Sequence, residues 1–235
     1  MTFDLTAQQE AWSRRAREFS QAVAGLAQAI DEHGVIPDDV RRAVTARSIT
    51  NPFADDAISA SVVVEEIAAV SSGVAAAMGL EWAGYTASSE QDGLPGLRGS
   101  ALDAAFRQGD GSGRVRLVLC AVAIGVGRAA VAQAVEVMKS RGIRPSGDEP
   151  TPHWALADAA AELDAARLLT LSAAQVVDRG ESADAPLSMA ARLSANAAER
   201  AVEAASLIEG PGGYRRGSAL ERLTRDARTL KLLLQ

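Results

Sequence analysis

The chain has 235 residues, of which 48% are hydrophobic and 4% aromatic, so small side chains form most of its core and favour closely packed helices. Its 24 lysines and arginines against 30 aspartates and glutamates give a net charge of −6 without a basic block, which excludes a nucleic-acid-binding surface and attraction to an acidic membrane. The single cysteine, Cys120, excludes an internal disulfide, and the two histidines, His33 and His153, lie far apart, so we predict no metal site.

The first residues of the chain lack the charged and apolar segments of a signal peptide. The longest apolar run, residues 117–126, is about half as long as a membrane-spanning helix. We therefore expect a cytoplasmic protein without a membrane partner, with this run in its core.

The first half of the chain has the spacing of helices. Thr6 followed by Gln9 has the form of a capping box, and apolar residues at helical intervals then predict one long helix that ends at Gly34. Three consecutive valines, residues 62–64, could form a strand by propensity alone, but their alanine-rich surroundings favour a helix. The predicted helices of this half cover residues 6–33, 37–48, 57–70 and 73–83.

Turn-forming residues dominate residues 82–113 and flank one short amphipathic stretch, residues 101–106. We interpret this segment as a connection between two helical halves. No part of the chain shows the alternation of short strands, so the sequence predicts an all-α bundle of about eight helices. The predicted helices of the second half cover residues 114–141, 153–179 and 186–209, and residue 218 to the C-terminus.

One segment of the second half offers two interpretations. Gly125, Gly127 and Ala130 have the spacing of a dinucleotide-binding turn. That turn requires a preceding strand, a following helix and further βα units, whereas the surrounding sequence is helical. The alternative, which we favour, is that the two glycines allow a neighbouring helix to approach closely within one continuous helix.

A second glycine-rich segment precedes the last helix. Exposed N–H groups near a helix N-terminus can hold an anion such as a pyrophosphate, so Gly210, Gly212, Gly213 and Tyr214 are candidate cofactor-binding residues, although the segment is also a good helix stop. Its surroundings, ASLIEGPGGYRRGSALERLTRDARTLKL, resemble the C-terminal signature of acyl-CoA dehydrogenases, in which a Gly-Gly-x-Gly-Tyr turn leads to Glu-Arg-x-x-Arg-Asp-Ala. The matching residues are Gly210, Gly213, Tyr214, Glu221, Arg222, Arg225, Asp226 and Ala227.

The resemblance extends upstream and implies a domain organisation. Three segments resemble helices of that family's C-terminal bundle: residues 114–142, 156–180 and 188–205. By this resemblance, Gly125 and Gly127 serve helix packing. The N-terminal helical domain of the family is resembled by residues 62–80. Family members place a β domain between these halves, and the connection here is too short to contain one. We therefore expect an N-terminal helical part over residues 1–100, a short connection over residues 101–113, and a C-terminal four-helix bundle over residues 114–235. The resemblance also implies a homodimer or tetramer packed through the bundle.

The residues that hold the cofactor in this family are altered. A glutamine before the glycine turn and an Arg-x-x-Phe-Gly stretch hold FAD across the dimer in family members. Leu207 stands at the glutamine position, and only a cation at Lys139 or Arg141 remains of the other stretch. FAD is therefore possible by resemblance, but these departures predict weak or absent binding.

The catalytic base also departs from the family pattern. Removal of the acyl α-proton requires a carboxylate, which the family places at one of two positions. Val115 and Leu234 occupy those positions here, so the catalytic residue is unknown. Arg116, which follows the first position, is the candidate substrate-binding residue.

Other polar residues have structural interpretations. We expect Arg225 and Asp226 to fix the last helix through a partly buried ion pair. Glu65 and Glu66 are adjacent on a helix, so they face different directions and cannot act as a paired acid and base, and one is expected to face solvent. Cys120 is expected to be an inert thiol in the core.

Three functional hypotheses follow from the resemblance and its departures. The first is a repurposed non-redox enzyme or acyl-thioester-binding protein in lipid or polyketide metabolism. The second is a non-catalytic subunit of a heteromeric FAD-dependent acyl-CoA dehydrogenase, paired with a longer relative. The third is a small flavoprotein oxidoreductase that acts on CH–CH groups.

Overall fold

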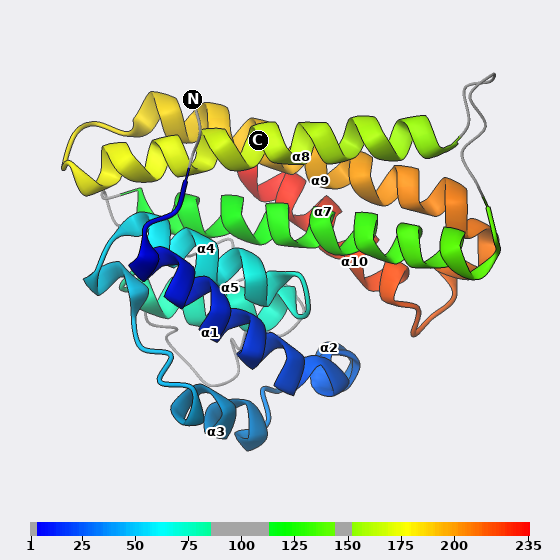
Figure 1. Ribbon diagram of the computed structural model, residues 1–235, viewed down its shortest axis with the longest axis horizontal. Coiled ribbons are helices and arrows are strands. Elements are labelled where there is room, and N and C mark those ends of the chain that lie inside the picture. The colour runs from blue at the N-terminus through cyan, green and yellow to red at the C-terminus, as the bar shows by residue number, and fades with distance from the viewer. Residues whose placement is uncertain (1–3, 86–112, 144–151) are drawn as a thin grey trace.

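A computed structural model describes residues 4–85, 113–143 and 152–235, and all regular structure in these residues is helical (Figure 1). The all-α prediction is confirmed for this part of the chain. The predicted stretch 101–106 lies outside the described residues, so the proposed connection and the domain boundaries beside it stay predictions. The N-terminal elements are α1 (Ala7–Val23), η1 (Ala24–Leu26), α2 (Ala27–His33), α3 (Asp38–Ala46), η2 (Pro52–Ala54), α4 (Ala57–Ala68) and α5 (Ser72–Trp82). The C-terminal elements are α7 (Arg114–Ser140), α8 (Pro152–Asp178), α9 (Asp184–Glu209), η5 (Gly210–Tyr214) and α10 (Ala219–Leu234).

The N-terminal helix begins as predicted but is interrupted. The Thr6 hydroxyl accepts a hydrogen bond from the Gln9 N–H at 3.3 Å, and the Gln9 side chain accepts one from the Thr6 N–H at 3.0 Å, which confirms the capping box. The prediction of one continuous helix to residue 33 is wrong, because the 3-10 turn η1 separates α1 from α2. Gly25 lies in this turn, and glycine is about 1 kcal/mol less favourable than alanine in a helix interior.

The other predicted helices are present, with boundaries that differ by one or a few residues. Val62, Val63 and Val64 belong to α4 and are each no more than 1% exposed, so packing outweighs their preference for strands. A Pro37 N-cap and two acidic residues in the first turn begin α3, as expected.

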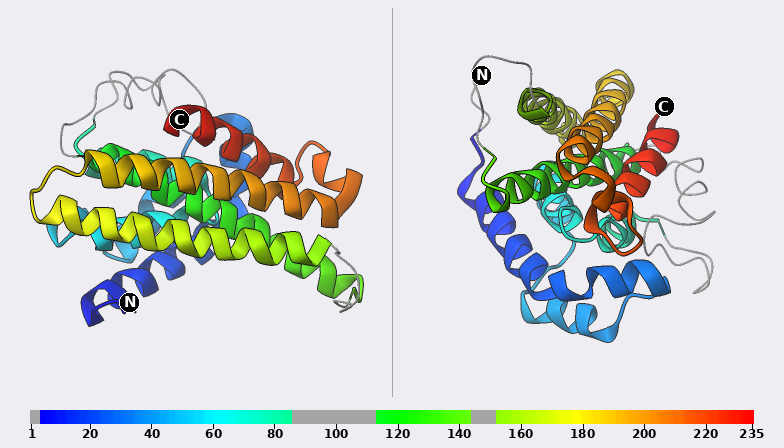
Figure 2. Two further views of the ribbon diagram at one scale, coloured as in Figure 1. Left: turned by 90° about the horizontal axis from the view of Figure 1, so that it is seen from above. Right: turned by 90° about the vertical axis from the view of Figure 1, so that its right-hand side faces the viewer.

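The long helices α7, α8 and α9 lie side by side, and α10 packs against α7 and α9 (Figure 1). These four helices form the predicted C-terminal bundle. The helix α7 also packs against α4 and α5, while α1 packs on the outside of α4, as the two turned views show (Figure 2). One continuous core therefore joins the N-terminal helices to the bundle through α7.

Close packing explains the glycine pair in α7. A Cβ atom on Gly125 would lie 2.5 Å from the backbone oxygen of Glu65, and one on Gly127 would lie 2.5 Å from a methyl group of Leu163. Both glycines lie within a helix that begins at Arg114, and none of the described residues before them forms a strand. The packing interpretation is confirmed and the dinucleotide-turn interpretation does not apply.

Within the described residues, α7 is the one helix that is long and apolar enough to cross a membrane. However, 72% of its most apolar 18-residue window is buried by the surrounding helices, as is usual for a core helix. Length and composition are therefore weak evidence for a membrane span, and the cytoplasmic location stays a prediction.

Candidate functional site

Three helices converge on a pocket of about 740 Å³ at one end of the bundle. Arg116 reaches it from the first turn of α7, Ser188 and Arg192 from the start of α9, and Leu234 from the end of α10. A guanidinium nitrogen of Arg116 donates a hydrogen bond to the Ser188 hydroxyl at 3.3 Å. Arg116, the candidate substrate-binding residue, and Leu234, at one of the two family base positions, thus line the same pocket, which we call the bundle-end pocket.

Neither family base position carries a proton acceptor. Leu234 is 6% exposed at the wall of the bundle-end pocket, and Val115 is 4% exposed and does not line it. Hydrocarbon side chains cannot remove an α-proton, and no carboxylate side chain is among the described residues that line the pocket. The described side chains of the pocket therefore offer no general base of the family type.

The glycine-rich segment forms a short 3-10 helix, η5, rather than an open loop. Gly210 ends α9 with a positive φ of 74°, Gly213 is buried, and the Tyr214 side chain is 64% exposed. Pro211 follows Gly210 and has no N–H group to donate to an anion. The segment therefore offers fewer donors than its glycine content suggested.

Two charged residues further change the surroundings of η5. Arg141 donates hydrogen bonds to the backbone oxygens of Ile208 at 2.8 Å and Glu209 at 3.0 Å, so it caps the C-terminal end of α9. The Glu209 side chain lies against Gly213, where an added Cβ would be 3.4 Å from its carboxyl carbon, and this carboxylate would repel a phosphate. The residues of η5 do not fit the pyrophosphate of FAD.

Two further positions of the family's FAD contacts, Lys139 and Leu207, also differ from the family pattern. Lys139 pairs with Glu136 at 2.7 Å on the surface of α7. Leu207, at the position of the family glutamine, is 68% exposed and has no polar group. Neither residue supplies the contacts that the family uses for FAD.

The ion pair expected at the last helix exists, but its partners differ from the expectation. Arg225 donates to the two carboxylate oxygens of Asp31 at 3.0 and 2.9 Å and also pairs with Glu221 at 3.2 Å, so it ties α10 to α2. The hydrogen bonds from Arg225 to Asp31 raise the pKa of the guanidinium. Asp226 instead accepts a hydrogen bond from the Ser72 hydroxyl at 2.5 Å, because adjacent residues of a helix point in different directions.

Asp226 is 1% exposed, and one of its carboxylate oxygens has no hydrogen-bond partner among the described residues. Burial raises its pKa to about 6, although the Ser72 hydrogen bond and the charge of Arg225 oppose this shift. Cys120 is completely buried, which confirms its expected place in the core, and burial raises the pKa of its thiol to about 12.

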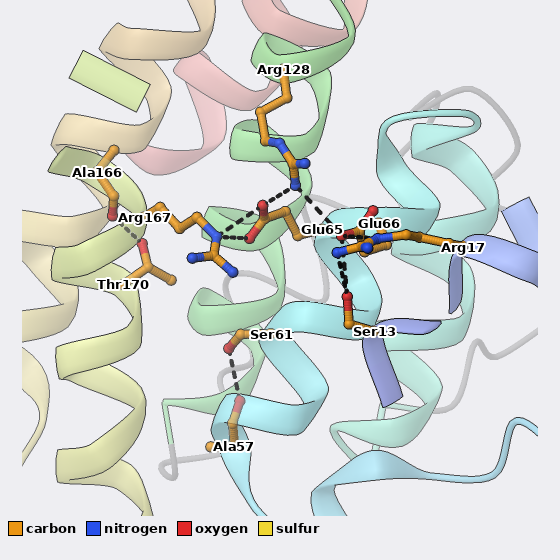
Figure 3. A network of polar contacts seen from close by, with 10 residues as sticks. All are labelled: Ser13, Arg17, Ala57, Ser61, Glu65, Glu66, Arg128, Ala166, Arg167 and Thr170. Carbon is orange, nitrogen blue, oxygen red and sulfur yellow. Dashed lines mark hydrogen bonds and ion pairs between the residues drawn. The ribbon is translucent and has the colours of Figure 1, made fainter. Parts of the chain in front are cut away.

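The sequence did not reveal a buried polar network between α4 and the bundle (Figure 3). Glu65 of α4 is 2% exposed and pairs with Arg128 of α7 and with Arg167 of α8, whose Nε lies 3.0 and 2.8 Å from the two carboxylate oxygens. Burial alone would lower the pKa of Arg128, but the charges of Glu65 and Glu66 outweigh burial and raise it. A glutamate inside an otherwise apolar helix was the signal that could have predicted a buried partner.

Glu66 accepts a hydrogen bond from Arg17 of α1 at 3.0 Å, and its Oε1 also lies 3.9 Å from the Arg128 nitrogen that pairs with Glu65 (Figure 3). Its side chain is only 12% exposed, so the expectation that one of the two glutamates faces solvent is wrong. Both carboxylates join helices and neither is available as an acid or base. The described ranges contain no group of three or more His, Cys, Asp or Glu side chains that could hold a metal ion.

Comparisons with known proteins agree with this architecture. Residues 112–233 match the model of the C-terminal domain of acyl-CoA dehydrogenases. Because this match covers just over half of the 235 residues, the chain belongs to the acyl-CoA dehydrogenase family.

The sequence relatives match about half of the chain. Over 119 residues it is 37% identical to a 3-(aryl)acrylate reductase of Clostridium sporogenes (strain ATCC 15579), and this segment covers 50% of the chain and 32% of the relative. It is 34% identical over 119 residues to an acyl-CoA dehydrogenase of Bacillus subtilis (strain 168), with coverages of 50% and 31%. The matched segment thus spans about a third of these curated relatives.

Solved structures extend the similarity to the whole chain. The butyryl-CoA dehydrogenase of Megasphaera elsdenii superposes with a TM-score of 0.74 at 17% identity, covering 98% of this chain and 95% of that one. A structure described as the electron transferring flavoprotein of Acidaminococcus fermentans gives a TM-score of 0.75 at 16% identity, with coverages of 99% and 95%. At these identities the similarity concerns the fold.

Proposed function

We propose that this protein binds an acyl thioester in the bundle-end pocket without carrying out α,β-dehydrogenation, as a non-redox enzyme or binding protein in lipid or polyketide metabolism. The observation that carries the proposal is that Arg116 and Leu234 line one pocket. The cation is retained for binding, while leucine replaces the carboxylate that the dehydrogenation would require.

The surroundings of η5 support the non-redox part of the proposal. Arg141 caps α9, Pro211 lacks a donor, and the Glu209 carboxylate lies beside Gly213. An FAD pyrophosphate would have to displace Arg141 from two backbone carbonyls and tolerate a nearby negative charge. We therefore expect FAD binding to be weak or absent.

A second candidate function is that of a non-catalytic subunit paired with a longer acyl-CoA dehydrogenase relative. Tyr214 of η5 is 64% exposed, and Leu207, near the end of α9, is 68% exposed. Exposed apolar groups of this kind favour a protein partner. A homodimer or tetramer could instead use the outer face of α8, where Trp154 and Leu168 are 58% and 44% exposed.

Calorimetric titration with hexanoyl-CoA tests the primary proposal. We expect the wild-type protein to bind, and Arg116→Gln to weaken binding about tenfold because a charge-assisted hydrogen bond is lost. Arg200→Gln is the matched control, since Arg200 lies on α9, is exposed and does not line the pocket. Absence of binding by the wild-type protein would refute the proposal.

A visible spectrum with and without added FAD separates the three hypotheses. A colourless protein that does not bind added FAD supports the non-redox proposal. A protein-perturbed flavin band at about 450 nm would instead indicate a small flavoprotein oxidoreductase. Size-exclusion chromatography with a purified longer relative tests the subunit hypothesis. A flavin band that forms only in the mixed complex, and that Leu207→Glu abolishes, would favour that hypothesis over the primary one.

A further inference from the structure

The surface beside the bundle-end pocket carries apolar side chains that water can reach. Leu232 of α10 is 83% exposed, and Met189, which lines the pocket from α9, is 57% exposed. Leu232 lies about one helical turn before Gln235, which also lines the pocket. The exposed leucine and the exposed methionine therefore lie next to the same pocket, one on each of two neighbouring helices.

The same parts of α9 and α10 are basic, although the chain as a whole has a net charge of −6. Residues 188–200 of α9 and 228–234 of α10 contain four basic residues and one acidic residue: Arg192, Arg200, Arg228, Lys231 and Glu199. Lys231 pairs with Glu199, and Arg200 pairs with Glu162 of α8. Arg192 and Arg228 are exposed and have no ion pair with any residue that the structure describes. This local excess of cations favours a partner with an acidic surface.

The arrangement of these residues suits a protein partner better than a small molecule. Arg228 and Leu232 are four residues apart on α10, so their side chains are neighbours on one face of the helix. Neither of them lines the bundle-end pocket, so a ligand inside the pocket does not require them. Arginine and methionine are enriched at protein interfaces, and exposed apolar side chains mark interaction sites. We call the surface formed by Met189, Arg192, Arg228 and Leu232 the α9–α10 face.

We propose that the acyl thioester is presented by an acidic acyl carrier protein, which docks on the α9–α10 face and inserts its phosphopantetheine arm into the bundle-end pocket. The inference rests on the proposed function, because it names the carrier of the ligand in the same pocket. Acidic side chains of the carrier protein pair with Arg192 and Arg228, while its apolar side chains pack against Leu232 and Met189. The other common carrier, CoA, offers no apolar side chain to Leu232.

Hexanoyl-CoA and a purified bacterial-type acyl carrier protein loaded with the same hexanoyl group test the inference, since they differ only in the carrier of the thioester. We expect calorimetry to show that the loaded carrier protein binds about tenfold more tightly than hexanoyl-CoA, because it makes the additional contacts with the α9–α10 face. Arg228→Glu and Leu232→Glu should each weaken binding of the carrier protein about tenfold, because each places a negative charge against an acidic partner. Both variants should bind hexanoyl-CoA as the wild-type protein does. Arg41→Glu is the matched control, since Arg41 lies on α3, is exposed and has no ion pair among the described residues, and it should change neither affinity.

Each other outcome overturns a distinct statement. If the loaded carrier protein binds no more tightly than hexanoyl-CoA, the inference is wrong and acyl-thioester binding stands. If the carrier protein binds more tightly but Arg228→Glu and Leu232→Glu have no larger effect than Arg41→Glu, the α9–α10 face is not its docking site and the inference is wrong. If neither thioester binds, the proposed function itself fails.

Discussion

The carboxylate of Glu65 lies between the guanidinium groups of Arg128 and Arg167, so one N-terminal helix holds two helices of the bundle through a single buried side chain (Figure 3). The Glu65 side chain is 3% exposed, whereas those of Arg128 and Arg167 are 42% and 27% exposed. The acid therefore depends on both arginines for compensation of its buried charge. Each arginine keeps partial access to water.

We predict that Glu65→Gln lowers the free energy of unfolding by about 3 kcal/mol, because it removes the counter-ion of Arg167 and leaves Arg128 with only the more distant carboxylate of Glu66, 3.9 Å away. Urea denaturation monitored by circular dichroism would measure the change. Glu66→Gln is the matched control, since its nearer partner Arg17 is 59% exposed and its second partner Arg128, 3.9 Å away, keeps Glu65. It should cost less than about 1 kcal/mol. Equal effects of the two substitutions would show that burial of Glu65 does not set the strength of the network.

The predictable part of the fold was the part that depends on local pattern. Apolar periodicity placed the helices within a few residues, and the form of Thr6 and Gln9 predicted their capping box. The interruption at η1 was missed, because three residues of 3-10 geometry keep nearly the same apolar spacing as an α-helix. Local pattern thus specified the elements better than their junctions.

The candidate site was predictable only in part, because its chemistry depends on contacts between distant residues. The resemblance singled out Arg116 and Leu234 separately, and the fold brings them into one pocket. Nothing in the local sequence connects Arg192 with Arg116, and nothing indicates that Arg141 caps α9 instead of remaining open to a phosphate. These pairings depend on how the helices pack.

We predict that Gly125→Ala destabilises the protein by about 3 kcal/mol or more, because its Cβ would lie 2.5 Å from the backbone oxygen of Glu65 and could not be accommodated without moving α4 from α7. Gly25→Ala is the control, since nothing lies within 4 Å of its Cβ position, and it should change stability by less than about 1 kcal/mol. Thermal unfolding of both variants would measure the difference. A neutral Gly125→Ala would contradict the close approach of α4 and α7.

Asp226 makes a pH-dependent contribution to stability. Its pKa is about 6 in the folded protein against 3.8 for an ordinary aspartate, so between these values the folded state retains a proton that the unfolded state has released. The contribution of this residue to stability is therefore largest below pH 3.8 and is lost as the pH rises through about 6. The total loss is at most about 3 kcal/mol, since one pKa unit corresponds to about 1.4 kcal/mol.

Asp226→Asn should consequently be more stable than the wild-type protein at pH 7.5, with the two proteins converging towards pH 4. The asparagine oxygen can still accept the hydrogen bond from Ser72, so the main change is removal of the buried charge. Urea denaturation across this pH range would measure the difference, with the exposed Asp158→Asn as a control. A stability difference that does not change with pH would contradict a raised pKa of Asp226.

Restoring a carboxylate at the family base position should not restore the family reaction. Leu234→Glu places an acid in the same pocket as Arg116, but a dehydrogenation also needs an acceptor for the two hydrogens, and the residues around η5 do not fit FAD. We expect no enoyl-CoA from hexanoyl-CoA with added FAD, measured by mass spectrometry as the loss of two hydrogens. The new carboxylate should instead lie beside Arg116 and change hexanoyl-CoA binding, which calorimetry would measure. Leu232→Glu is the matched control, because Leu232 is 83% exposed on the same helix and does not line the pocket. Enoyl-CoA formation by Leu234→Glu alone would show that a working flavin site exists and that only the base was missing.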